Sequence, residues 1–100
     1  MFKAWPIETV ETEFRRLKVL QYLAGIPSYE AAVSVIRLHC GRIGVPTNAD
    51  QAVAAIAWLD EMELVTTRDY QGEPIARLTN KGREVATGAT SMPGVIRPDP

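Results

Sequence analysis

The stretch that decides the fold is TNADQAVAAIAWLDEMELV, residues 47–65. Thr47 or Asn48 can cap a helix here, because each carries a side-chain oxygen for an unpaired backbone N–H. Gln51 stands three residues after Asn48 and completes the spacing of a capping box. Apolar residues then recur at helical spacing, namely Ala52, Val53, Ile56, Leu59 and Met62. The stretch therefore predicts a capped helix that leads directly into a strand.

Two further helices are expected before it. Apolar residues follow a period near 3.6 over residues 7–24, and Gly25 with Pro27 ends that helix. Its cations are interpreted as a solvated face rather than a phosphate-binding patch: Arg15, Arg16 and Lys18. Ser28 is expected to cap a second helix over about residues 29–43, with an inner face of Ala32, Val35, Ile36, His39, Cys40 and Ile43. The short connection to the third helix is what a helix-turn-helix requires.

A hairpin and one more helix follow. Residues 64–68 and 75–78 are strand candidates around a turn that offers Gly72 a positive φ, and we call this hairpin the wing. Thr79 is expected to cap a fourth helix over roughly residues 80–86, which Gly88 ends. The predicted fold class is mainly α with a small β-hairpin, a winged helix-turn-helix. Residues 1–88 form the domain, and residues 89–100 form an extended tail that either packs on a surface or is disordered.

Composition bounds the class of protein. One hundred residues suit one domain. With 11 basic and 12 acidic residues, the chain as a whole lacks the charge excess typical of nucleic-acid binding. A single cysteine allows no internal disulfide, which fits a reducing compartment. No apolar run is long enough to span a membrane, and no signal peptide is recognised. We expect a cytoplasmic protein.

Catalysis and metal binding find no support in the sequence. His39 and Cys40 are adjacent, so on a helix their side chains point about 100° apart and cannot form a nucleophile–base pair. One histidine and one cysteine do not supply the roughly four ligands of a zinc site. No phosphate-binding glycine motif is present. We expect no enzyme activity, no metal and no cofactor.

Two segments resemble bacterial winged-helix regulators: WLDEMELV at 58–65, and LTNKGREVA at 78–86. The chain departs from them at Glu63, where those regulators most often have glycine. A closer resemblance, to the small winged-helix proteins of Mu-like phages and prophages, covers nearly the whole chain. It rests on Arg16-Leu17, AWL at 57–59, the LTxxG pattern at 78–82 and the ending MPGVIRPDP at 92–100. This resemblance implies a phage or prophage origin and a winged-helix fold, but little about activity.

DNA binding is the usual function of a winged helix, whose third helix enters the major groove. Asn48 and Gln51 are the candidate base-reading residues. The stretch that contains this helix carries four carboxylates and no cation, which phosphates would repel. A solvated wing is the favoured interpretation of the hairpin; if the protein binds DNA, phosphate contact is expected from the wing region rather than from this helix. The candidate residues in the wing region are Arg68, Tyr70, Arg77, Lys81 and Arg83.

The outward positions of the third helix also suit a protein interface. Ala54, Ala57 and Trp58 offer small residues with one aromatic anchor, and Trp5 is a further candidate. The alternative is that Trp58 packs within its own chain. The leading function is a DNA-associated accessory protein or transcriptional regulator that acts as a homodimer. The alternative is a module that binds a phage or host protein and no longer reads bases. A continuous negative surface around the third helix and the wing would favour the alternative.

Overall fold

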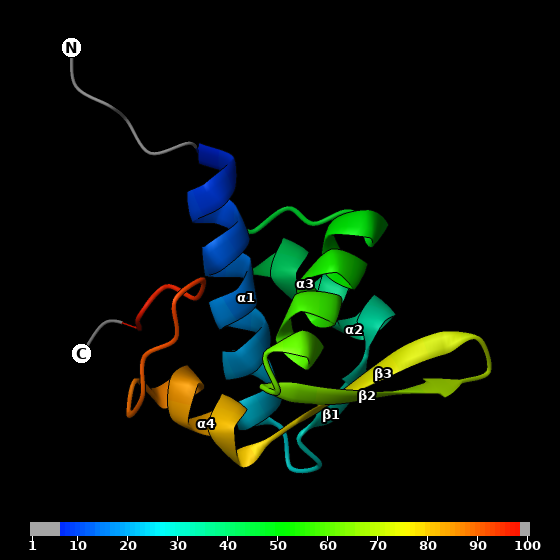
Figure 1. Cartoon of the computed structure of the whole chain (residues 1–100). Helices are drawn as coiled ribbons and strands as arrows, with labels where there is room; N and C mark the ends of the chain where they lie inside the picture. Colours follow the sequence, from blue (N-terminus) through cyan, green and yellow to red (C-terminus); the bar gives the residue numbers. More distant parts are fainter. Residues whose placement is uncertain (1–6, 99–100) are drawn as a thin grey trace.

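The computed structural model describes residues 7–98, and within them it has four helices and a three-stranded antiparallel sheet (Figure 1). The elements are α1 (Ile7–Gly25), β1 (Glu30–Ala32), α2 (Val33–Arg42), α3 (Ala49–Glu61), β2 (Val65–Tyr70), β3 (Glu73–Leu78) and α4 (Asn80–Thr87). The sheet order is β1-β3-β2. Figure 1 shows the β2–β3 hairpin extending away from the helical body. None of the described helices is both long enough and apolar enough to cross a bilayer.

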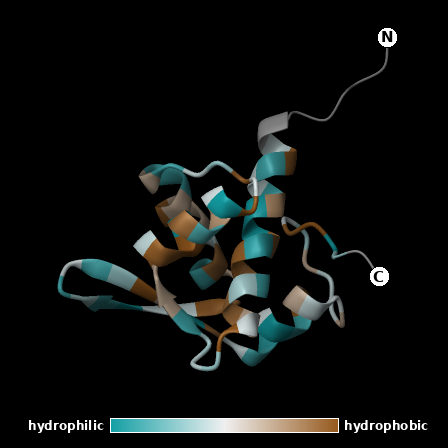
Figure 2. Cartoon of the chain, turned by 180° about the vertical axis from the view of Figure 1, so that it is seen from behind, coloured by the Kyte–Doolittle hydropathy of each residue, from teal (hydrophilic) through white to brown (hydrophobic). Residues whose placement is uncertain are grey.

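α1 is the element around which the other helices pack, since α2, α3 and α4 all contact it. Its inner face places Leu20 and Leu23 at 0% exposure. Leu59 of α3 and Val65 at the start of β2 are equally buried. These side chains belong to one core, whose burial is the main favourable term in folding. In Figure 2 the tip of the hairpin is hydrophilic, and hydrophobic residues gather towards its base.

The second helix begins at Val33, about four residues later than the sequence predicts. Residues 30–32 instead form β1, in which Glu30 pairs with Arg77 of β3. The prediction of a two-stranded hairpin alone is therefore wrong. Ser28 does not cap α2: Ala32 is the N-cap and provides no side-chain hydrogen bond. The cap comes from the hairpin, because the backbone N–H of Ser34 donates to Glu73 Oε1 at 2.8 Å.

The predicted inner face of α2 is correct in part. Ile36 and Cys40 are buried, as expected, together with Val33. Val35 and Ile43 are 44% and 41% exposed. Val33, Ile36 and Cys40 follow the i, i+3, i+7 spacing of one buried stripe, whereas Val35 lies beside that stripe and Ile43 is the C-cap beyond the last helical residue.

The predicted caps of α3 and α4 are confirmed. Asn48 caps α3 in a full capping box with Gln51. The Thr79 hydroxyl accepts from the N–H of Gly82 at 3.0 Å and caps α4, and Gly88 ends that helix at a φ of 85°. A Cβ on Gly82 would collide with the carbonyl oxygen of Leu64. The LTxxG pattern thus combines a cap with a glycine that allows α4 to lie against the backbone that precedes β2.

The described part of the C-terminal segment packs on the body without forming a helix or strand. Val95 is buried, and the N–H of Ile96 donates to the carbonyl oxygen of Glu13 on α1 at 3.5 Å. Gly94 has a φ of 98° and lies against the ring of Trp58. Of the two alternatives for the tail, the described residues follow the packed one.

Candidate interaction surface on α3 and the hairpin

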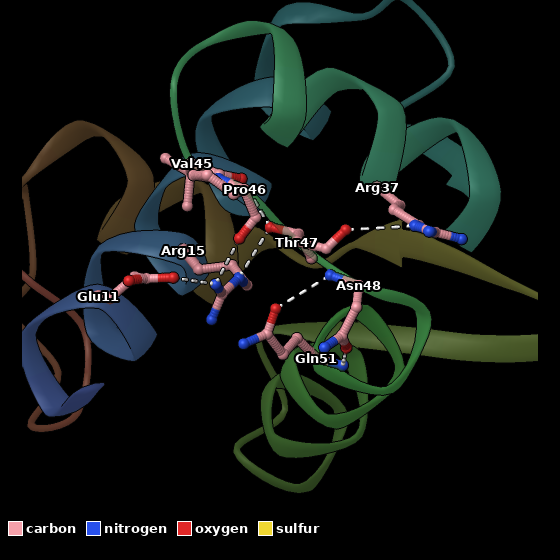
Figure 3. Close-up of polar contacts among 8 residues, drawn as sticks. All are labelled: Glu11, Arg15, Arg37, Val45, Pro46, Thr47, Asn48 and Gln51. Atoms are coloured by element: carbon pink, nitrogen blue, oxygen red, sulfur yellow. Dashed lines mark hydrogen bonds and ion pairs between the residues drawn. The ribbon is translucent and has the colours of Figure 1, made fainter.

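The turn between α2 and α3 is held by a buried arginine from α1 (Figure 3). Arg15 is 3% exposed. Its Nε donates to Thr47 Oγ1 at 2.9 Å, and its Nη2 donates to the carbonyl oxygen of Pro46 at 3.0 Å. Nη2 also forms an ion pair with Glu11 at 2.7 Å. The interpretation of Arg15 as part of a solvated face is wrong, because its guanidinium faces the turn.

Thr47 connects three elements at this turn. Its hydroxyl donates to the carbonyl oxygen of Val45 at 2.8 Å, while its own carbonyl oxygen accepts from Arg37 Nε at 3.2 Å. Arg15 approaches from α1 and Arg37 from α2 (Figure 3). The position at which α3 begins is therefore fixed by contacts from both preceding helices. The sequence does not predict this role of Arg15, because the acceptors on Thr47 and Pro46 lie 32 and 31 residues away.

The two candidate base-reading residues are occupied with each other. Asn48 Oδ1 accepts from the N–H of Gln51 at 2.7 Å, and Gln51 Oε1 accepts from the N–H of Asn48 at 2.9 Å. An amide that reads adenine uses its oxygen and its nitrogen together. Here both oxygens already face backbone N–H groups, so bidentate reading would require the cap to open. Opening a cap costs about 1 kcal/mol.

The exposed surface of α3 is apolar and acidic. Val53 is 50% exposed, and Ala54 and Ala57 are exposed beside it. The exposed charged residues of the helix are Asp50, Asp60 and Glu61. α3 contains no lysine or arginine.

A hollow of about 190 Å³ lies where α3 meets the hairpin. Its lining residues are Val33, Val53, Ile56, Ala57, Asp60, Thr67 and Pro74. Thr67 Oγ1 donates to Asp60 Oδ2 at 3.0 Å, which joins β2 to α3 at one side. Asp69 lies two residues after Thr67 on β2 and therefore on the same face of the sheet. The hollow is thus apolar inside, with carboxylates at its edge.

The arginines of the hairpin lie on the other face of the sheet. Arg77 pairs with Thr66, and Arg68 is two residues from Thr66, so their side chains share one face, opposite to that of Thr67. Both arginines approach the same carboxylate: Arg68 Nη2 lies 3.1 Å from Glu30 Oε1, and Arg77 Nη1 lies 3.9 Å from Glu30 Oε2. Tyr70 is on that face as well and is 57% exposed.

The two candidate cations of α4 have their own contacts. Lys81 Nζ donates to the carbonyl oxygen of Met62 at 3.3 Å. The guanidinium of Arg83 lies 4.5 Å from the centre of the Tyr29 ring. The structure thus brings Arg68 and Arg77 together around Glu30, and it pairs Asn48 with Gln51 at the start of α3.

Trp58 packs within its own chain. The guanidinium of Arg16 lies 4.0 Å from the centre of its ring and donates to the carbonyl oxygen of Gly94 at 2.9 Å. Burial lowers the pKa of Arg16, and the nearby Glu13 partly opposes that shift. Arg16, like Arg15, is therefore not part of a solvated face. Of the two alternatives for Trp58, the structure follows the one in which it packs within its own chain. Of the other candidate interface residues, Ala54 and Ala57 are exposed. Trp5 lies outside the described residues.

Cysteine and metal chemistry have little support at this site. Cys40 is fully buried, and burial raises the pKa of its thiol, while the Thr47 hydroxyl and the charge of Arg15 oppose that shift. A raised pKa disfavours the thiolate, which is the reactive form. Among the side chains that the structure describes, residues 9–98, no group of three or more His, Cys, Asp or Glu is arranged to hold a metal ion.

Comparison with known proteins identifies a phage relative. No protein-family model matches the sequence, and no solved structure matches it. The chain is 34% identical over 94 residues to the uncharacterized protein gp26 of Escherichia phage Mu, and the alignment covers 94% of this chain and 97% of that protein. The Mu-like phage origin implied by the sequence resemblance is confirmed by this relative. The chain belongs to the family of the phage Mu protein gp26.

Proposed function

We propose that this phage protein is a winged helix-turn-helix whose α3–hairpin surface docks another protein rather than reading bases. The element order supports the fold: α2 and α3 are joined by a short turn, and a β-hairpin follows α3 directly. In such a fold the third helix and the wing form the surface that meets a partner.

The observation that carries this proposal is the character of the exposed α3 surface. It has three carboxylates, no cation and an apolar patch of Val53, Ala54 and Ala57. Neutralising phosphates with lysine and arginine supplies most of the affinity of DNA-binding proteins. A surface that lacks these cations is poorly suited to a duplex, whereas exposed apolar residues favour a protein partner.

The cations of the hairpin do not compensate. Arg68 and Arg77 lie on the sheet face away from the hollow, and Glu30 lies between them. Only part of their positive charge is then free for a phosphate. The partner we propose is a phage or host protein, with no cofactor and no catalytic step.

A homodimer is tested by light scattering at micromolar concentration, where a monomer alone would exclude self-association at this surface.

A DNA-associated accessory or regulatory role is the second candidate, and one observation favours it. Arg37 and Arg42 are exposed on α2 and line a hollow of about 450 Å³ together with Ser34 and Thr47. This hollow adjoins the start of α3. Two arginines at that place could contact a phosphate without any contribution from α3 itself.

A titration of labelled duplex DNA at about 50 mM salt separates the two functions, because electrostatic binding is strongest at low salt. The docking proposal predicts no shift of duplexes of any sequence. The DNA candidate predicts binding that is lost in Arg37→Ala and Arg42→Ala and keeps no sequence preference. Tight, sequence-selective binding that depends on Asn48 or Gln51 would contradict the docking proposal, since the cap would then have to open.

A further inference from the structure

The hollow between α3 and the hairpin has the size of a single side chain. Its volume is about 190 Å³, whereas pockets for small-molecule ligands start at about 300 Å³. A metabolite or nucleotide would therefore be poorly enclosed. Interfaces between proteins, by contrast, commonly place one anchor side chain in a pocket of this kind.

The lining selects an apolar anchor. Val33, Val53, Ile56, Ala57 and Pro74 supply hydrocarbon surface from α2, α3 and β3. The polar pair that also lines the hollow, Asp60 and Thr67, is already joined by a hydrogen bond. A polar anchor would therefore find no unpaired buried donor or acceptor in this lining, and its own hydrogen bonds would be lost.

The charge at the edge of the hollow determines which charge suits the partner residues on either side of the anchor. Asp60 and Glu61 are exposed on α3, and Asp69 is exposed on the hairpin face that also carries Thr67. The cations of the hairpin, Arg68 and Arg77, occupy the opposite face. Complementary charge across an interface suppresses wrong partners and fixes the register of the right one.

We propose that the hollow receives one aliphatic side chain from a basic segment of a partner protein, in which lysine or arginine flanks the anchor. The proposal rests on the docking function and names the partner chemistry for the same surface. The aliphatic side chain fills the hollow, and the cations meet Asp60, Glu61 and Asp69. Binding therefore weakens with added salt, because the charged residues are exposed and screened.

The full chain is used to select binders from a displayed library of random peptides of roughly 15 residues, about four helical turns. The expected consensus has one leucine, isoleucine, valine or methionine with lysine or arginine beside it. A synthetic consensus peptide, labelled for anisotropy, is then titrated against variants. Ala57→Leu fills the hollow and should weaken binding about tenfold or more, as loss of an anchor site does. Asp60→Asn with Glu61→Gln should weaken binding and flatten its salt dependence.

Ala49→Leu is the matched control, since Ala49 is also exposed on α3 but neither lines the hollow nor belongs to the apolar patch. It should change affinity by less than about twofold, as a surface position outside the anchor site does. Circular dichroism verifies that both leucine variants fold. A consensus without cations that still depends on Ala57 would overturn the charge assignment and leave the docking function in place. Peptides that bind both leucine variants normally, or a library that yields no binder, would overturn both proposals.

Discussion

Replacement of Arg15 by methionine tests the polar contacts that position α3. Methionine keeps an apolar stem of similar length and removes the guanidinium. Arg15 gives two hydrogen bonds to the α2–α3 turn, at 2.9 Å to Thr47 and 3.0 Å to Pro46. Hydrogen bonds that involve a charged group contribute about 1.5 kcal/mol or more each, so the pair is worth about 3 kcal/mol.

Two corrections bring the expected loss to about 2–3 kcal/mol. The ion pair with Glu11 adds little, because the Glu11 side chain is 42% exposed and exposed pairs are worth about 0–1 kcal/mol. Pro46 is exposed, so water can satisfy part of its carbonyl after the change. In a domain of this size, such a loss lowers the melting temperature by roughly 10–20 °C.

Urea denaturation followed by far-UV circular dichroism measures the free energy of unfolding from the midpoint and the slope. Arg42→Met is the matched control, because Arg42 is exposed on α2 and should change stability by less than about 0.5 kcal/mol. Thr47→Val combined with Arg15→Met should be non-additive, since the two side chains are in contact. A loss below about 1 kcal/mol in Arg15→Met, within the range of surface substitutions, would refute the assignment of Arg15 to the turn.

Three other changes have clear expected outcomes. Gly82→Ala should lower the free energy of unfolding by about 2 kcal/mol or more, because its Cβ would meet backbone. Gly41→Ala should raise the free energy of unfolding by about 0.5–1 kcal/mol, because nothing lies within 4 Å of its Cβ. Chemical denaturation of both variants measures the contrast. Gly94→Ala requires a φ near 98° and a Cβ 2.5 Å from the Trp58 ring, so the C-terminal segment should be displaced and Trp58 should become accessible to a fluorescence quencher. Hydrogen bonds from the side chain and from the backbone N–H of Ser34 lower the pKa of Glu73 below its ordinary 4.5. The stabilising effect of this carboxylate is therefore full above that value and is lost as the pH falls through the lowered pKa. Wild type should therefore lose its advantage over Glu73→Gln on acidification, and melting curves in which the difference does not change with pH would count against this contact.

Local rules predicted the starts of α3 and α4 but not that of α2. The Asn48–Gln51 box and the Thr79 cap involve partners three residues away, so their spacing is visible in the sequence. Glu63 is a similar case: it stands where the bacterial regulators that this segment resembles most often have glycine, and the structure gives it a φ of 63°, in the left-handed region that glycine favours. In each instance the determinant and its effect lie within one turn of chain.

Contacts between distant residues were not predictable in the same way. The short strand Glu30–Ala32 has low β propensity and forms because β3 offers it a partner more than 40 residues later. Arg15 is buried because its acceptors, Pro46 and Thr47, are 31 and 32 residues away. A charged residue on a helix is normally solvated, so only knowledge of those acceptors could reverse that expectation. The absence of cations from α3, by contrast, is read directly from the residues of the helix, although periodicity grouped Val53 with the apolar stripe and Val53 is 50% exposed.

The residues that hold α3 in place and the residues that α3 displays are different sets. Arg15 and Thr47 act from α1 and the α2–α3 turn, whereas Ala54 and Ala57 are exposed on α3. The displayed surface can therefore change without loss of the fold, and one fold can serve different partners. This separation is testable by adding cations where the chain has none. Ala54→Arg with Ala57→Arg should leave stability within about 0.5 kcal/mol of wild type and should create low-salt duplex binding with a salt slope of about one unit for each phosphate that the new arginines neutralise. Gel-shift titrations at several salt concentrations measure that slope. A folded double variant that binds no duplex would show that α3 and the hairpin do not present a DNA-compatible shape, and the winged-helix assignment of this surface would be wrong.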